Sequence, residues 1–174
     1  MLNPRSGYNA DMFCQHDSTQ TSTYYNWLGV ETALIADAGS VAVITGCDGE
    51  TTVVKRMEAC GEIPFGLLMQ EIRKAYDHAY MPWGMIKPHD MGTQMTFAGG
   101  PVAVAHLGIH DTNVYDATTA ISAGDRLYPT ASGTLTSVSG SDNCGTFIAI
   151  AMNSLTTAEL ATGRLLRIKL LIYE

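Results

Sequence analysis

A phrase of turn and strand residues recurs along this chain and constrains the possible fold more than any other feature. The clearest copy spans residues 123–151, a looser copy spans residues 38–69, and a fragment occupies residues 98–104. Each full copy has a glycine turn, short apolar runs and a β-branched run, a pattern typical of short strands joined by tight turns. The sequence therefore predicts an all-β fold, a small β-barrel or β-tulip-like domain.

Strand-length runs lie in both halves of the chain. We expect strands at residues 32–36, 41–45, 51–54, 65–69, 102–109 and 165–172. The last run alternates strictly, so that Leu166, Ile168 and Leu170 face one way while Arg167 and Lys169 face the other. The pattern leaves open whether residues 32–75 and 119–172 form one barrel or two.

The first 30 residues have no clear period, yet they are rich in aromatic side chains, which are usually scarce in unstructured tails. We interpret residues 1–30 as an extended N-terminal interaction arm and residues 31–174 as the β-barrel domain. Tyr24, Tyr25 and Trp27 are the expected anchors, because desolvated aromatic rings dominate interface energetics. The alternative is that this segment supplies a first strand of the domain's own barrel.

Apolar residues fall at helical spacing across residues 70–80, which predicts one short helix that Pro82 would end. Residues 76–96 are expected to form a long loop excursion, whose first residues overlap the end of the predicted helix. Long ordered loops are usually functional surfaces, so Trp83 is a further candidate for the interface. A loop folded over its own barrel is the alternative.

The charge of the chain limits its partners. The net charge is −7, and the ten basic residues form no stripe, which excludes the phosphate-binding surface of a nucleic-acid-binding protein. No run approaches the roughly 20 apolar residues that span a bilayer, and none resembles a secretory signal. We therefore expect a soluble protein made in a cytoplasm, without nucleic-acid or membrane partners.

The four cysteines, Cys14, Cys47, Cys60 and Cys144, are spaced too widely for a CxxC-type zinc site. The expectation is that they are free thiols acting as small core residues. A Cys47–Cys60 disulfide is the alternative, although a reducing compartment would disfavour it.

The best candidate for a reactive group is the run that contains His106, His110 and Asp111. On a strand, however, a four-residue step covers about 13 Å, too far for both histidines to bind one ion. The chain also lacks a nucleophile elbow and a glycine-rich phosphate loop. We therefore expect no catalytic, metal-binding or cofactor-binding residues and no small-molecule substrate.

The recurring phrases resemble a known family. The runs Ala123-Gly124-Asp125-Arg126-Leu127-Tyr128, Ser132-Gly133-Thr134-Leu135-Thr136, Ile148-Ala149-Ile150-Ala151 and the final strand to Leu170 look like the decoration, or cement, proteins of tailed-phage capsids. Ala149 stands where that family usually has glycine. Earlier strands of the family are matched by Phe65-Gly66-Leu67-Leu68 and Gly100-Pro101-Val102-Ala103-Val104, so the resemblance covers about residues 32–72 and 97–172.

The resemblance implies a structural virion protein, not an enzyme, which binds the outer surface of a bacteriophage capsid. Its partners would be the major capsid protein and further copies of itself, often as a homotrimer. It would be assembled in the host cytoplasm and located on the capsid surface. One alternative is another virion module, associated with a tail or fibre. A second, from a different class, is a small metal-dependent hydrolase that uses His106, His110 and Asp111.

Overall fold

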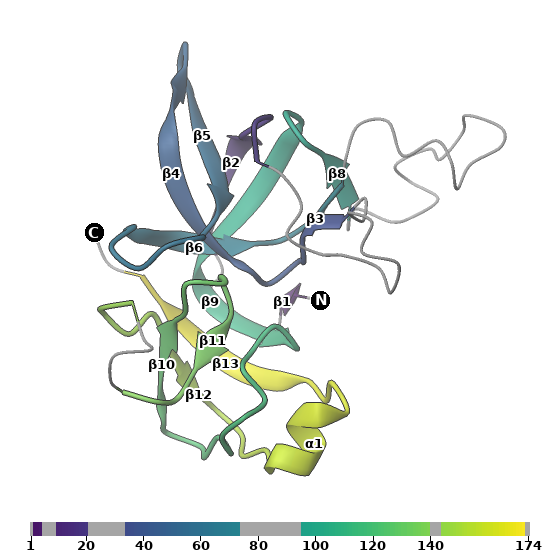
Figure 1. Cartoon of the computed structure of the whole chain (residues 1–174), viewed down its shortest axis with the longest axis vertical. Coiled ribbons are helices and arrows are strands. Elements are labelled where there is room, and N and C mark those ends of the chain that lie inside the picture. The colour runs from purple at the N-terminus through teal and green to yellow at the C-terminus, as the bar shows by residue number, and fades with distance from the viewer. Residues whose placement is uncertain (1, 5–9, 21–33, 74–94, 140–143, 173–174) are drawn as a thin grey trace, which may run out of the picture.

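The computed structural model describes residues 2–4, 10–20, 34–73, 95–139 and 144–172 (Figure 1). The strands are β1 (Leu2–Pro4), β2 (Ala10–His16), β3 (Leu34–Ala36), β4 (Val41–Asp48), β5 (Thr51–Arg56), β6 (Pro64–Leu68), β7 (Glu71–Arg73), β8 (Met95–Phe97), β9 (Pro101–Thr112), β10 (Arg126–Pro129), β11 (Leu135–Thr136), β12 (Ala149–Ala151) and β13 (Leu166–Leu171), and the helix is α1 (Thr157–Ala161). The all-β prediction is confirmed.

Five strands are paired in a closed ring. Starting at β9, the pairing passes through β2, β5, β4 and β6, and β6 pairs with β9 again. Strands β6 and β9 approach each other closely where the ring closes, because Gly66 on β6 has no side chain to separate them. A Cβ at Gly66 would be 2.3 Å from Val104 Cγ1 and 2.6 Å from the carbonyl oxygen of Ala105. The missing side chain of Gly66 therefore lets the ring close.

The C-terminal half of β9 belongs to a second, open part of the same sheet. There β9 pairs with β1 on one side and with β13 on the other, and the order continues through β12 and β10 to β11. Figure 1 shows β9 running from the ring into this part. The two halves of the sequence thus form neither one closed barrel nor two, but a ring and an open half-sheet that share β9.

Two hydrophobic clusters fill this arrangement. Every ring strand contributes to one of them, through Cys14, Ala42, Val54, Leu68, Val102 and Val104, and the small β3-β7-β8 sheet adds Ile35, Ala36 and Ile72. The other cluster joins Val41, Val43 and Leu67 of the ring to the half-sheet. Side chains of β4 alternate between the two clusters, so β4 is buried on both faces up to Val43.

The helix predicted at residues 70–80 is wrong where it can be checked. Glu71–Arg73 is strand β7, because pairing with β3 and β8 and the burial of Ile72 outweigh the helical spacing. Residues 74–94 lie outside the described residues, whereas Met95 and Thr96, at the end of the predicted loop, belong to strand β8, because they pair with β7. The helix among the described residues is α1, which begins with a Thr156–Glu159 capping box. No helix in the described ranges is long and apolar enough to cross a membrane.

The described part of the predicted N-terminal arm lies within the sheet. Strand β2 is paired with β9 on one side and with β5 on the other, and β1 is paired with β9. These residues follow the alternative interpretation, an integral strand. Residues 21–30, which hold Tyr24, Tyr25 and Trp27, lie outside the described residues, and for them the arm stays a prediction.

Candidate functional site

His106, His110 and Asp111 all lie on β9, as their sequence spacing requires. An extra residue, His106, interrupts the pairing with β2, because Ala10 lies opposite Leu107 and Asp11 opposite Ala105. His110 is buried, and its Nε2 atom lies 3.3 Å from the Leu107 carbonyl oxygen. Within the described ranges, no group of three or more His, Cys, Asp or Glu residues could hold a metal ion.

Asp111 forms an ion pair with a residue on the neighbouring strand, β13. The Nε atom of Arg167 on β13 donates to Asp111 Oδ1 at 3.0 Å, and the two residues are directly opposite in the sheet. The hydrogen bond and the charge of Asp111 raise the pKa of Arg167. The pair compensates a carboxylate that is almost fully buried, so its first role is to hold β9 and β13 in register.

A second polar cluster lies where β2 and β5 end. The Gln20 amide donates from Nε2 to the Arg56 carbonyl oxygen (2.9 Å) and accepts at Oε1 from the Arg56 backbone N–H (3.0 Å). Because these bonds fix the amide, Oε1 can only accept from His16 Nε2, 3.0 Å away, and the imidazole carries its proton there. His16 Nδ1 has no hydrogen-bond partner among the described residues.

Burial lowers the pKa of His16, against the opposing effects of the Gln20 hydrogen bond and the charges of Asp17 and Glu58. The side chain is 1% exposed, so a substrate could not reach the imidazole without local opening. This cluster therefore fastens the turn at residues 17–20 to the end of β5. Sequence reasoning missed it, because nothing in the spacing of His16, Gln20 and Arg56 indicates that the turn after β2 contacts the end of β5.

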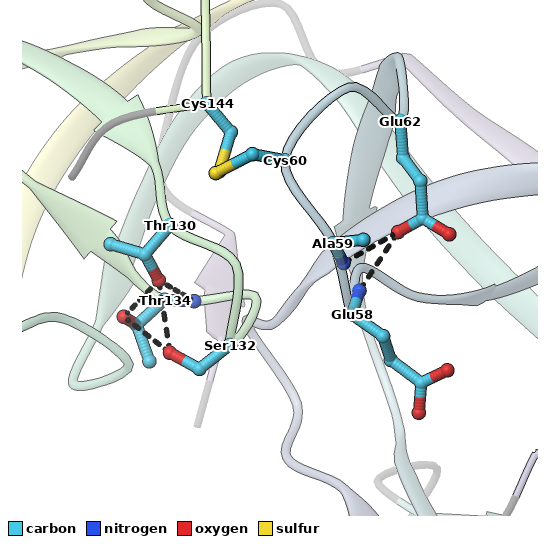
Figure 2. Close-up of a disulfide and its surroundings, with 8 residues drawn as sticks. All are labelled: Glu58, Ala59, Cys60, Glu62, Thr130, Ser132, Thr134 and Cys144. Carbon is cyan, nitrogen blue, oxygen red and sulfur yellow. Dashed lines mark hydrogen bonds between the residues drawn. A yellow bond between two sulfur atoms is a disulfide. The ribbon is translucent and has the colours of Figure 1, made fainter. Parts of the chain in front are cut away.

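The cysteines correct the expectation of free thiols. Cys60 and Cys144 form a disulfide across 84 residues of sequence, although Cys14 and Cys47 are free. The disulfide joins the loop after β5 to the segment that leads to β12, as Figure 2 shows. The alternative Cys47–Cys60 bridge does not form. Spacing could not reveal the true pair, since the two cysteines meet only once the ring packs on the half-sheet.

The exposed loop that carries Cys60 is held in place by its own side chains. Glu62 Oε2 accepts from the backbone N–H groups of Glu58 and Ala59, at 2.8 and 3.1 Å (Figure 2). Glu62 Oε1 lies 2.9 Å from Lys55 Nζ, which also contacts Glu58. These contacts and the disulfide fix a loop in which the next side chain, Ile63, is 83% exposed.

Three large apolar side chains of the described residues are exposed: Ile44 and Ile63, near the base of the β4–β5 hairpin, and Met152 after β12. Ile44 directly follows Val43, and Ile63 directly precedes Pro64, in the last pair of the β4–β6 ladder. They form an apolar surface that sequence reasoning missed. Only the position of Ile63 beside Pro64, at a strand start, could have signalled it.

The predicted interface residues, Tyr24, Tyr25, Trp27 and Trp83, all lie outside the described residues. Comparison with models of known protein families finds no match, and comparison with curated proteins finds none. Function must therefore be inferred from the geometry of the described residues and from the resemblance of the strand motifs.

Proposed function

We propose that this chain is a structural virion protein that binds the outer surface of a phage capsid and stabilises the contacts between capsomers. It acts by burying surface area and catalyses no reaction. Its partners are the major capsid protein and further copies of itself, and a homotrimer is the expected assembly. Repeated contacts around a shell would add affinity through multivalency, without any single tight interface.

One observation carries the proposal. The four sequence phrases on which the resemblance rests become β10, β11, β12 and β13, and these strands are neighbours in one sheet, in the order β11-β10-β12-β13. A glycine turn precedes β10. Its Gly124 has a φ of 94°, a backbone conformation that favours glycine. The phrases therefore describe one folded unit, as a shared architecture with decoration proteins requires.

The disulfide also agrees with a location on a particle. Disulfides are rare in a reducing cytoplasm and persist in oxidising surroundings. A virion protein is made in the host cytoplasm and then spends its working life outside the cell. The Cys60–Cys144 bond would stabilise the domain in that second environment.

The proposal is tested with shells assembled from the matching major capsid protein without this chain. Purified protein should co-sediment with these shells to a saturating stoichiometry and should raise the temperature at which they fall apart. Trp27→Ala and Trp83→Ala should each weaken binding by about 2 kcal/mol per contact if these rings are hot spots. A protein that stays in the supernatant at every concentration would refute a role on the shell, and binding to purified tails would favour the tail-associated alternative.

A further inference from the structure

One edge of β4 is covered along only three of its eight residues. Strand β6 pairs with β4 from Val41 to Val43 and then stops at Pro64. Proline has no N–H group and so cannot continue a ladder of backbone hydrogen bonds. From Ile44 to Asp48, β4 pairs with β5 on one side, and among the described residues no strand lies on its other side. Figure 1 shows this part of the hairpin projecting beyond the ring.

An open edge of this kind exposes unpaired backbone groups and can accept a further strand. Residues 44–50 are all exposed, which keeps the edge accessible. At its base lie Ile44 and Ile63, which are 51% and 83% exposed. The loop that carries Ile63 is already fixed by Glu62 and by the disulfide, so little further ordering would be needed to cover this side chain.

The charge of the hairpin selects among possible occupants. Its exposed residues include two carboxylates, Asp48 and Glu50, and no Lys or Arg lies between Ile44 and Thr52. The next cation along the chain, Lys55, is paired with Glu58 and Glu62. A second copy would present the same acidic edge and would be repelled, whereas a strand with basic side chains would be attracted.

We propose that the open edge of β4 binds an extended, basic segment of another protein by strand addition. The segment pairs its backbone with β4 from Ile44 to Asp48. Its apolar side chains cover Ile44 and Ile63, and its Lys or Arg side chains lie near Asp48 and Glu50. This interaction surface is independent of the proposed function, because it requires no capsid and none of the predicted aromatic anchors.

The probe is a labelled peptide of roughly nine residues, the length of a long strand, in which lysine alternates with valine. A second peptide with glutamate in place of lysine is the control for charge. Fluorescence anisotropy at constant ionic strength measures the affinity of both. The lysine peptide should bind the intact protein more tightly than the glutamate peptide, and Asp48→Lys with Glu50→Lys should reverse this preference.

The apolar contact is tested in the same assay. Ile63→Ser should weaken binding of the lysine peptide at least about fivefold, as expected when one apolar side chain is no longer buried. Met152→Ser removes another exposed apolar side chain, far from the hairpin in sequence, and should leave binding unchanged. Hydrogen exchange should slow at residues 44–48 when the peptide binds, which separates strand addition from nonspecific adhesion of charges.

Several outcomes would overturn the inference. Equal binding of the two peptides, no binding of either, or unchanged hydrogen exchange at residues 44–48 would each contradict it. Self-association that depends on protein concentration and disappears in Ile63→Ser, without peptide binding, would instead assign the edge to a second copy. None of these results depends on whether the protein binds capsids.

Discussion

Gly66 lies where β6 comes closest to β9, and the atoms that a methyl group would meet there include backbone. Backbone cannot rotate away as the end of a long side chain can, so the ring would have to open slightly or distort. Gly46, on the exposed part of β4, has no atom within 4 Å of its would-be Cβ position. The two glycines therefore form a matched pair for testing the closure of the ring.

We predict that Gly66→Ala lowers the free energy of unfolding by about 3 kcal/mol, the upper range for overpacking a buried site. Gly46→Ala should change it by no more than about 0.5 kcal/mol, as is usual at the surface. Urea unfolding of the oxidised proteins measures both. Equal stabilities of the two variants would show that β6 does not approach β9 as described.

His16 gives a prediction on pH. Burial lowers its pKa in the folded protein, so the unfolded chain, with an ordinary histidine pKa of about 6.5, binds a proton first as the pH falls. Neutral His16 makes its full contribution to the free energy of unfolding above about pH 6.5. This contribution is lost as the pH falls towards the lowered pKa of His16 in the folded protein. Asp17 and Glu58 are the charged groups that raise the pKa of this ring against the effect of burial.

We predict that His16→Gln makes the free energy of unfolding less sensitive to pH between 7 and 5, because glutamine can still donate to Gln20 but does not titrate. Denaturant midpoints across this interval, for the variant and the parent protein, measure the difference. Identical slopes would mean that His16 is not buried in its neutral form.

At the scale of elements, the sequence predicted individual strands well and their partners poorly. Alternation in the last strand is confirmed, since Leu166, Ile168 and Leu170 are buried while Arg167 and Lys169 are exposed. Alternation reports only which face of a strand is buried. It does not report that β9 is shared by the ring and the half-sheet, because that depends on contacts between residues far apart in the chain.

Most of the candidate site could not be predicted for the same reason. Asp111 pairs with Arg167, His16 with Gln20, and Cys60 with Cys144, and only the second pair is close in sequence. Helix α1 is different, because the Thr156–Glu159 capping box is a local signal that the sequence displays openly. This helix was nevertheless not predicted, and the pairings set by the closure of the sheet have no comparable local signal.

The disulfide gives a prediction at this scale. Native protein should react with an alkylating reagent at one thiol, Cys47, because Cys14 is buried and the other two cysteines are bonded. The denatured, unreduced protein should react at two. Mass spectrometry counts the adducts, and labelling of all four cysteines without a reductant would show that the bond does not form.

Loss of the bond should also destabilise the fold. For a loop of 84 residues, the loop-entropy relation gives a loss of about 4–5 kcal/mol. Replacing Cys60 and Cys144 by serine should approach this value in denaturant unfolding, whereas Cys47→Ser, at an exposed free thiol, should have little effect. Equal stability of the two variants would contradict a stabilising role of the disulfide between the ring and the half-sheet.

The position of β2 leads to a further prediction. Removal of residues 1–16 would take one strand from the ring and leave the facing edges of β9 and β5 unpaired. We predict that the shortened protein is unfolded or aggregates, as measured by circular dichroism and sedimentation. A folded, monomeric product would show that β2 is dispensable and would return residues 1–16 to the predicted arm.

At the scale of the whole molecule, β9 fastens a closed ring to an open half-sheet, and a disulfide joins the two a second time. Such a body presents the projecting β4–β5 hairpin on one side and the open half-sheet on the other (Figure 1). Two parts joined by a shared strand and a disulfide would suit the proposed bridging role, because such links reduce the conformational freedom that is lost on binding.

Cryo-electron microscopy of shells prepared with and without this protein tests the proposed role most directly. We predict added density at symmetry-related positions on the outer surface. The ring and half-sheet should fit this density as one body, and the density should bridge neighbouring capsomers. Identical reconstructions, or added density confined to a tail or portal vertex, would contradict a decoration role.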